Sequence, residues 1–340
     1  MTTGKFLTGE WKQLVDAPQL IRHLVTVADI GGTHARLARW TAAAGLDAPL
    51  RVRNDDFRGP VDLLETWLRR QPEGPRRVVL ALAMPVGGDA RQLTNRAWRF
   101  EPSALIGALR LESLVIVNDF AAAAAGIDAL SRQDLQTLNA DGAVPVPGVR
   151  IVVGPGTGLG VAAVAEDDPP RIIASEAGHI TFGSADPIAA QLNTEGRARW
   201  GRVSWERLLC GDGLAWLHAV TSGNQGFDGA AHVARAAAAG DPGAIATVRL
   251  FSRLLGEFAG DVCLAFQALE GVYLSGGVLR GLLDTFDASG FLSAFAAKGR
   301  FSDPLRRVPV YFVAGHELGM QGAARFLAGQ CRMPSTEWHA

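Results

Sequence analysis

This chain of 340 residues contains little lysine, little cysteine and almost no net charge. Only three of its 33 basic residues are lysines, Lys5, Lys12 and Lys298, so the lysine of a Walker-A loop or of a protein-kinase strand has almost no candidate. The formal charge of −1 provides no attraction to nucleic acid or to an anionic membrane surface, and neither is expected as a partner. No run of about 18 apolar residues is present, so no membrane span is predicted.

The three cysteines, Cys210, Cys263 and Cys331, lie far apart and form no C-x-x-C pair. An odd number of isolated cysteines predicts neither a disulfide framework nor a cysteine zinc site. Each is therefore expected to act as a small buried hydrophobic residue. No secretory signal precedes them, so the reducing cytoplasm is the expected location.

Short β-branched runs alternate with helical patterns, which predicts an α/β fold of about two domains. Residues 23–30 predict a strand that ends at two glycines, and residues 35–40 alternate like a strand returning from a tight turn. Pro60 is suited to the first position of a helix. The opening strands thus indicate a mixed sheet flanked by helices.

The second half repeats this opening, about 125 residues later. A strand over residues 149–153 leads into a glycine-rich turn, and residues 161–164 return from it. The repetition suggests two related halves that face each other. Further elements predicted from the pattern are strands at 78–83, 114–117, 271–274 and 308–313, and helices around 10–15, 242–269 and 320–328.

The first glycine turn follows a strand that carries Asp29 and Ile30 at its end. Gly31 and Gly32 have no side chain to keep an anion away from the backbone N–H groups, and Thr33 adds a hydroxyl donor. A carboxylate at the strand end suits Mg²⁺. An ordinary hairpin turn is the better explanation of the two glycines when they are taken alone.

The second glycine turn, from Gly154 to Gly160, contains Thr157 and again lies between predicted strands. It is not a G-x-G-x-x-G fingerprint, because alternating apolar residues and not a helix follow it. Two such turns, each with a threonine, suit a triphosphate held from both sides. Gly276 and Gly277 follow another strand and predict a flat surface for a purine base.

Asn118 and Asp119 follow the apolar strand at 114–117. A carboxylate at the end of a buried strand lies where ligands bind to such sheets. Asp119 is a candidate general base for an attacking alcohol. The same residue is also a candidate N-cap of a helix over 120–126, and the two roles are compatible.

Glu176, His179 and Glu206 supply several hydrogen-bond acceptors and few donors, which suits a polyol. They lack metal-ligand spacing, because no H-E-x-x-H motif is present. A histidine in the core and a glutamate on an exposed helix are the alternative explanations.

The ordered set of motifs resembles bacterial ATP-dependent glucokinases, over about Val25 to Leu327. The zinc motif of the related repressor and kinase group is absent, so the resemblance is to the zinc-free branch. Ala177 stands where a second glycine is commoner in the family. The matching segments are 29–37, 117–120, 154–161, 176–179, 206–214, 271–278, 288–291 and 298–301.

The resemblance implies the two-domain actin-like ATPase (ribonuclease H-like) fold, with mixed sheets flanked by helices and a cleft between the domains. Its domains would be a small α/β domain of residues 23–130 plus 319–340 and a large one of residues 131–318, after an N-terminal extension of residues 1–22. It also implies a cytoplasmic homodimer.

The implied reaction is MgATP-dependent phosphorylation of glucose at its 6-hydroxyl, the first step of glycolysis. By resemblance, Asp119 is the catalytic base, and Asp29 lies near Mg²⁺ and contacts it through water. The implied sugar ligands are Asn118, Asp119, Glu176, His179 and Glu206, and the implied nucleotide-binding residues are Asp29, Ile30, Gly31, Gly32, Thr33, His34, Gly156, Thr157, Gly276 and Gly277.

Three other functions remain as alternatives. A kinase of another hexose (mannose, fructose or an amino sugar) would use the same polar residues. A sugar-responsive transcription factor would need an N-terminal helix-turn-helix of about 60 residues and a basic face, for which the sequence gives no sign. A nucleotide switch without catalysis would leave Asp119 and the Glu/His set without a purpose.

Overall fold

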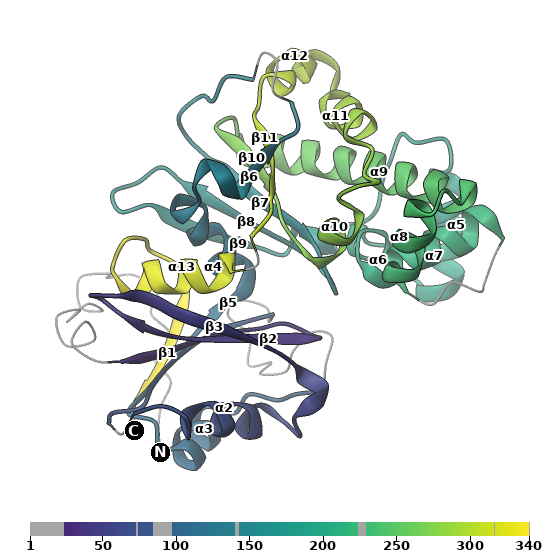
Figure 1. The fold of residues 1–340 in the computed structure, drawn as a ribbon. Helices are drawn as coiled ribbons and strands as arrows, with labels where there is room; N and C mark the ends of the chain where they lie inside the picture. Colours follow the sequence, from purple (N-terminus) through teal and green to yellow (C-terminus); the bar gives the residue numbers. More distant parts are fainter. Residues whose placement is uncertain are drawn as a thin grey trace. The chain divides into compact units, whose positions relative to one another are not determined.

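The computed structural model describes residues 24–72, 74–83, 97–139, 143–223, 229–315 and 317–339 (Figure 1). The N-terminal extension and the helix predicted around residues 10–15 lie outside this range. Contacts within the chain define two compact units. The first comprises the described residues up to Leu130, Val164–Ala174 and those from Gly315 onward, and the second comprises Ser131–Ala163 and Ser175–Ala314. Val164–Ala174 fall within the range predicted for the large domain.

The first sheet has the strand order β12-β5-β4-β1-β2-β3. β1 is antiparallel to β2 and parallel to β4, and β4 is parallel to β5, so the sheet is mixed as predicted. β12 adds an antiparallel edge beside β5, and no sequence signal predicted it. The strands are β1 Val25–Ile30, β2 His34–Thr41, β3 Gly45–Arg53, β4 Arg77–Leu82, β5 Ser113–Asn118 and β12 Ser335–His339.

The second sheet has the order β6-β11-β10-β7-β8-β9 and repeats the arrangement of the first. In the first sheet β1, β2 and β3 are neighbours, and β4 and β5 continue the sheet in parallel on the other side of β1. In the second sheet β7, β8 and β9 are neighbours, and β10 and β11 continue it in parallel on the other side of β7. The repeat inferred from the two glycine turns is therefore a repeat of sheet topology. The strands are β6 Leu135–Thr137, β7 Arg150–Pro155, β8 Leu159–Ala165, β9 Arg171–Ser175, β10 Gly271–Leu274 and β11 Val310–Val313.

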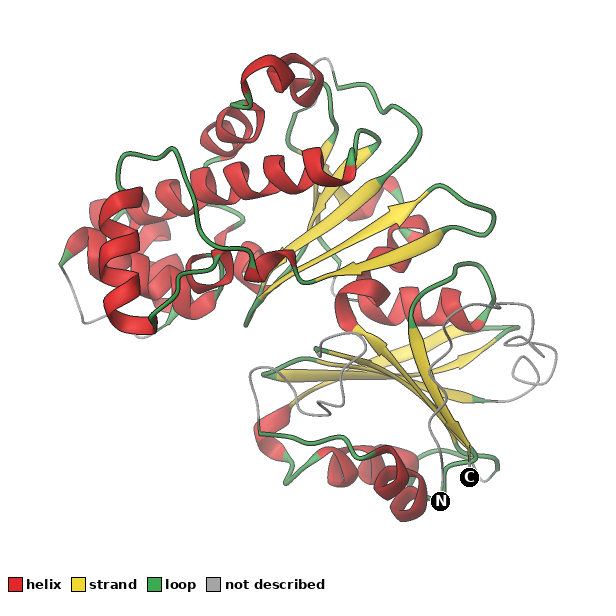
Figure 2. Ribbon diagram, turned by 180° about the vertical axis from the view of Figure 1, so that it is seen from behind, coloured by secondary structure: helices red, strands yellow, loops and turns green. Residues whose placement is uncertain are grey.

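Helices flank both sheets (Figure 2). Four of the predicted helices are present, with α2 beginning at Pro60, α4 covering residues 119–126, α9 beginning at Pro242 and α13 close to the predicted C-terminal position. The helices are α2 Pro60–Leu68, α3 Pro102–Leu109, α4 Asp119–Gly126, α5 Ala189–Trp200, α6 Trp205–Leu208, α7 Gly211–Ser222, α8 Ala230–Ala238, α9 Pro242–Phe266, α10 Gly277–Leu282, α11 Ala288–Ala296, α12 Ser302–Arg306 and α13 Leu318–Leu327.

The first sheet is covered on both sides (Figure 1). α2 and α3 pack on one side, where Leu64, Leu105 and Leu80 belong to one buried cluster. α4 and α13 lie on the other side and pack closely, since a Cβ at Gly322 would overlap the carbonyl oxygen of Ala122. Every residue of β4 is buried, as expected for a covered central strand.

The second unit is built around the long helix α9, most of which is buried. Asp241 caps its N-terminus by accepting the Ala244 N–H, and Gly256 and Gly260 allow α11 to approach the helix backbone. Within the described ranges, no helix combines the length and apolar character required to span a membrane. All three cysteines are free and buried, which confirms their predicted role, and burial raises the pKa of Cys263 to about 12.

Candidate active site

The first glycine turn links β1 to β2. The Gly31 N–H donates to the His34 carbonyl at 3.1 Å, and the side chain of Asn54 donates to the carbonyls of Gly31 and Gly32 at 2.8 and 3.1 Å. Thr33 is exposed at the tip of the turn. Burial and the neighbouring arginines, Arg51 first, lower the pKa of His34, so its ring is uncharged at neutral pH.

Asp29 lies directly before this turn and is paired with an arginine. Its Oδ2 lies 2.9 Å from Nη1 of Arg36, its partner in the β1–β2 register, and both side chains are about 15% exposed. Its carboxyl carbon would be 3.2 Å from a Cβ at Gly319, so α13 packs closely against it. Asp29 thus presents a carboxylate that is held in place and partly neutralised.

Asn118 and Asp119 lie at the junction of β5 and α4. The predicted N-cap was one residue too late, because Asn118 is the cap and its Oδ1 accepts the Ala121 N–H at 2.9 Å. Asp119 is the first residue of the helix, and its Oδ1 accepts the Phe120 N–H at 2.9 Å. A helix N-terminus favours a negatively charged side chain, and a candidate general base must carry this charge before it can accept a proton.

Glu176, His179 and Glu206 come together in the second unit, as predicted. Nε2 of His179 lies 3.8 Å from Glu176 Oε2, and its Nδ1 lies 3.7 Å from Glu206 Oε1. Both separations are longer than a hydrogen bond. In the described part of the chain, neither the Glu176 carboxylate nor the His179 ring has a hydrogen-bond partner, and both side chains are about half exposed. Their acceptors and donors are available to a polar ligand.

The two carboxylates differ in their surroundings. Burial raises the pKa of Glu176, against the opposing effect of His179, and Glu206 raises it further. Glu206 is only 20% exposed and its Oε2 accepts the Leu159 N–H at 2.9 Å. It therefore is not the exposed helical glutamate of the alternative explanation.

The second glycine turn joins β7 to β8, and neighbouring motifs of the second unit converge on it. The Gly211 N–H donates to the Gly156 carbonyl at 2.9 Å, and Glu206 binds Leu159. Gly178, between Glu176 and His179, approaches the Leu159 carbonyl so closely that a Cβ there would overlap it. The predicted sugar ligand Glu206 and the backbone at Gly178 thus both contact Leu159, which belongs to the predicted phosphate turn.

Gly276 lies against the same turn. Its φ of +135° belongs to the region that favours glycine, and a Cβ there would overlap the Pro155 carbonyl oxygen. Gly277 begins α10, where the sequence predicted only a turn, and no atom lies within 4 Å of a Cβ built on it. The open space beside Gly277 is consistent with the predicted flat surface.

The predicted residues divide between the units. Asp29, Ile30, Gly31, Gly32, Thr33, His34, Asn118 and Asp119 belong to the first, and Gly156, Thr157, Glu176, His179, Glu206, Gly276 and Gly277 belong to the second. The sequence analysis did not predict a role for Asn54. This residue directly follows β3, belongs to no motif and lies 21 residues after Thr33 in the sequence.

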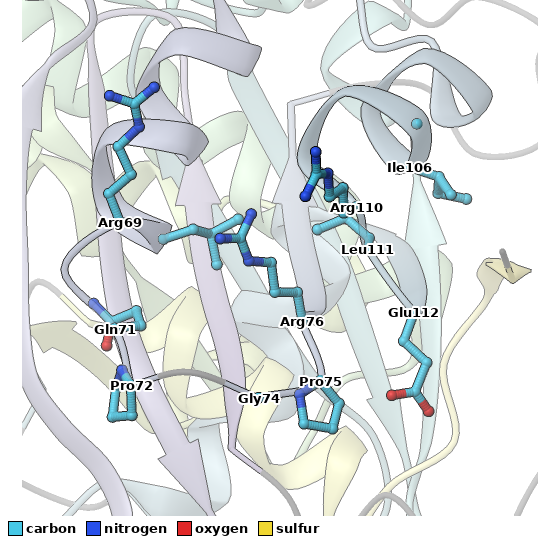
Figure 3. A pocket seen from close by; sticks show the side chains of 12 residues that line it. Arg69, Gln71, Pro72, Gly74, Pro75, Arg76, Ile106, Arg110, Leu111 and Glu112 are labelled. Carbon is cyan, nitrogen blue, oxygen red and sulfur yellow. The ribbon is translucent and has the colours of Figure 1, made fainter.

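A cavity of about 990 Å³ lies in the first unit where α2 and α3 end (Figure 3). Its lining includes Arg69, Arg76 and Arg110 and none of the predicted site residues. Arg69 pairs with Glu65 at 2.7 Å, and Nη1 of Arg76 donates to the Leu109 carbonyl at 2.9 Å. Among the described residues, no group of three His, Cys, Asp or Glu side chains is arranged to hold a metal ion.

Comparison with known proteins identifies the family. The model of the glucokinase family matches residues 26–330. This chain belongs to the glucokinase family. It is 36% identical over 321 residues to a glucokinase of Stenotrophomonas maltophilia, covering 89% of this chain and 95% of that one. It is also 33% identical over 326 residues to the bifunctional protein glk of Paraburkholderia xenovorans, and spans half the length of that relative.

A solved structure agrees with this assignment. The glucokinase of an Antarctic psychrotroph has a TM-score of 0.69 and 30% identity, with 90% of this chain and 99% of that chain covered. The predicted α/β fold class is confirmed, and the chain is an ATP-dependent hexose kinase of the glucokinase family. A preference for another hexose is not favoured by these relatives.

Proposed function

We propose that the chain transfers the γ-phosphate of MgATP to the 6-hydroxyl of glucose, with Asp119 as the general base. The observation that carries this proposal is the position of Asp119 at the first residue of α4, directly after the covered strand β5. The Asp119 carboxylate accepts the 6-hydroxyl proton while the oxygen attacks phosphorus. Such a base contributes about 10²–10⁴ in rate.

Glucose is bound by Asn118, Glu176, His179 and Glu206. The support for this set is the exposed and unsatisfied polar surface of Glu176 and His179, beside the fixed carboxylate of Glu206. Carboxylate oxygens accept hydrogen bonds from sugar hydroxyls, and an imidazole both donates and accepts. A sugar with a hydroxyl in the wrong position would leave one of these polar groups unpaired, which is the basis for discrimination.

The nucleotide phosphates are bound by the turns around Gly31–Thr33 and Gly156–Thr157. Phosphoryl transfer depends mainly on positioning and on electrostatic stabilisation of the phosphate oxygens. Mg²⁺ would neutralise charge on those oxygens. Asp29 fits a contact with Mg²⁺ through water, because Arg36 already occupies one of its carboxylate oxygens at 2.9 Å.

We also propose the cytoplasm as the location of the enzyme and a homodimer as its assembly. The buried, unpaired cysteines support the first of these proposals. The domains of residues 23–130 plus 319–340 and 131–318, with Val164–Ala174 reassigned to the first, are proposed to close on the sugar, which would exclude water as a competing acceptor.

The test combines a sugar panel with variants of the base. ADP release from ATP is measured with no sugar, with glucose and with mannose, fructose and an amino sugar. Asp119→Asn keeps an acceptor for the Phe120 N–H but removes the base, so kcat should fall by about 10²–10⁴ with little change in glucose affinity. Asp62→Asn, which changes an acidic residue in the first turn of α2, is the matched control. Wild-type turnover in Asp119→Asn would refute the assignment.

A further inference from the structure

Asn54 lies directly behind the first glycine turn. Its Nδ2 donates to the carbonyl oxygens of Gly31 and Gly32, at 2.8 and 3.1 Å, and its backbone N–H donates to the carbonyl of Thr33 at 3.0 Å. One residue therefore binds three consecutive carbonyl groups of the turn. Because Asn54 is completely buried, this support comes from the inner side of the turn.

These hydrogen bonds fix the direction of the next three amides. In a planar trans peptide the C=O and the following N–H point in opposite directions. With their carbonyls held by Asn54, the peptide groups direct the N–H of Gly32, Thr33 and His34 away from it. Thr33 is exposed, so this is the outer side of the turn. Successive N–H groups on one side of a turn form the concave site in which proteins bind phosphate.

The other half of the amide is not satisfied. The Oδ1 of Asn54 is buried and has no hydrogen-bond partner in the residues that the structure describes. A buried acceptor without a partner is unfavourable, so Oδ1 does not stabilise this region. The favourable half of the amide is its two N–H groups, which bind the Gly31 and Gly32 carbonyls as no apolar side chain of the same size would.

We propose that Asn54 is a positioning residue that directs the amides of the first glycine turn toward the phosphates of the nucleotide. The inference rests on the proposed function, since it takes this turn as a phosphate site. Asn54 acts through the backbone of Gly31, Gly32 and Thr33 and does not touch the nucleotide. Its removal should therefore weaken binding of phosphates and leave sugar binding intact.

The main variants are Asn54→Asp and Asn54→Ala. The first has the same size but places carboxylate oxygens against two carbonyls, and the second removes the donors without adding charge. The KM for ATP should rise about tenfold or more in Asn54→Asp and severalfold in Asn54→Ala, with the KM for glucose changed less than about twofold. Calorimetry should show weaker ATP binding in both variants, whereas inhibition by adenosine, which lacks phosphates, should be unchanged.

Asn139→Ala is the control for a purely structural asparagine. Asn139 lies in the second unit, donates to the Val308 carbonyl at 2.6 Å and accepts the Val310 N–H at 2.9 Å. This variant should lower the melting temperature and the yield of folded enzyme but leave the KM for ATP unchanged. It separates loss of folded protein from loss of phosphate binding.

Two results would overturn the inference. One is wild-type ATP affinity in folded Asn54→Ala, and the other is a loss of kcat in proportion to folded protein with an unchanged KM for ATP, as expected for Asn139→Ala. Failure of the proposed function is distinguishable, because the wild-type enzyme itself would then release no ADP with any hexose.

Discussion

The two glycine turns occupy equivalent places in two sheets of the same topology, yet they are held by different means. The first turn is fixed by side chains, since Asn54 binds its carbonyls and Arg36 pairs with Asp29 before it. The second turn is fixed largely by glycines, because Gly178 and Gly276 let neighbouring backbone reach it. A Cβ at Gly31, by contrast, would make only an ordinary contact of 3.7 Å.

This difference shows which changes each turn tolerates. Removing a side chain is expected to damage the first turn, whereas adding one at Gly178 or Gly276 is expected to damage the second, which has Glu206 as an additional side-chain support. The second turn is also connected to the segments that carry the proposed sugar ligands, because Glu206 and Gly178 both contact Leu159. In the first turn the corresponding support comes from Asn54, which binds the carbonyls of Gly31 and Gly32.

The largest effect on the second turn is expected from Gly276→Ala. A Cβ at this position overlaps the Pro155 carbonyl, and the φ of +135° adds backbone strain. Overpacking and strain together should cost about 2–4 kcal/mol of folding free energy and raise the KM for ATP. Thermal unfolding and kinetics measure both effects. The control is Gly281→Ala on α10, because no atom lies within 4 Å of a Cβ built at Gly281. Equal melting temperatures of the two variants would contradict the view that the second turn depends on close backbone approach at Gly276.

A smaller effect is expected from Glu206→Gln. Glutamine retains an oxygen for the Leu159 N–H but removes the charge that faces His179. The KM for glucose should therefore rise by about tenfold, while the KM for ATP changes little. Glu206→Ala should raise both constants, because the second turn also loses its acceptor. The control is Glu195→Gln on α5, whose carboxylate accepts a hydrogen bond from the nearby Gln191. An unchanged KM for glucose in Glu206→Gln would argue against the proposed contact.

The smallest effect is a pH-dependent gain of stability in Glu176→Gln. Burial raises the pKa of Glu176 in the folded protein, so the folded state holds this proton more tightly than the unfolded state. Its contribution to stability is present at low pH and is lost as the pH rises through the raised pKa. The melting temperature of the variant should be slightly higher than that of the wild type at pH 7. The difference should vanish at pH values below the ordinary pKa of a glutamate. A lower melting temperature at pH 7 would contradict this sign.

The elements that carry the motifs were predictable because they are strongly patterned. Gly271–Leu274 is predicted to the residue, and the strand that contains Asp29 ends at Ile30, directly before the two glycines. The N-cap before α4 was misplaced by one residue, because asparagine and aspartate are both good caps and only the coordinates show which side chain binds the Ala121 N–H.

Other features depend on contacts between distant parts of the chain. Asn54 meets the first turn only because β3 pairs with β2, and nothing near Asn54 in the sequence indicates that pairing. β12 is five residues long and has a mixed polar and aromatic pattern, so only its partner β5 defines it as a strand. The shared contact at Leu159 likewise requires the fold to bring α6 and the Glu176–His179 segment to the same turn.

The order of the chain has a consequence for biosynthesis. β5, which carries Asn118 at its end, receives its edge partner β12 and the covering helix α13 from residues that follow the whole second unit. On the ribosome, residues 131–314 are therefore complete before the first sheet acquires its last strand. The second unit is able to collapse during translation, whereas the strand leading to Asp119 has an open edge that stays exposed to chaperones until the final segment emerges.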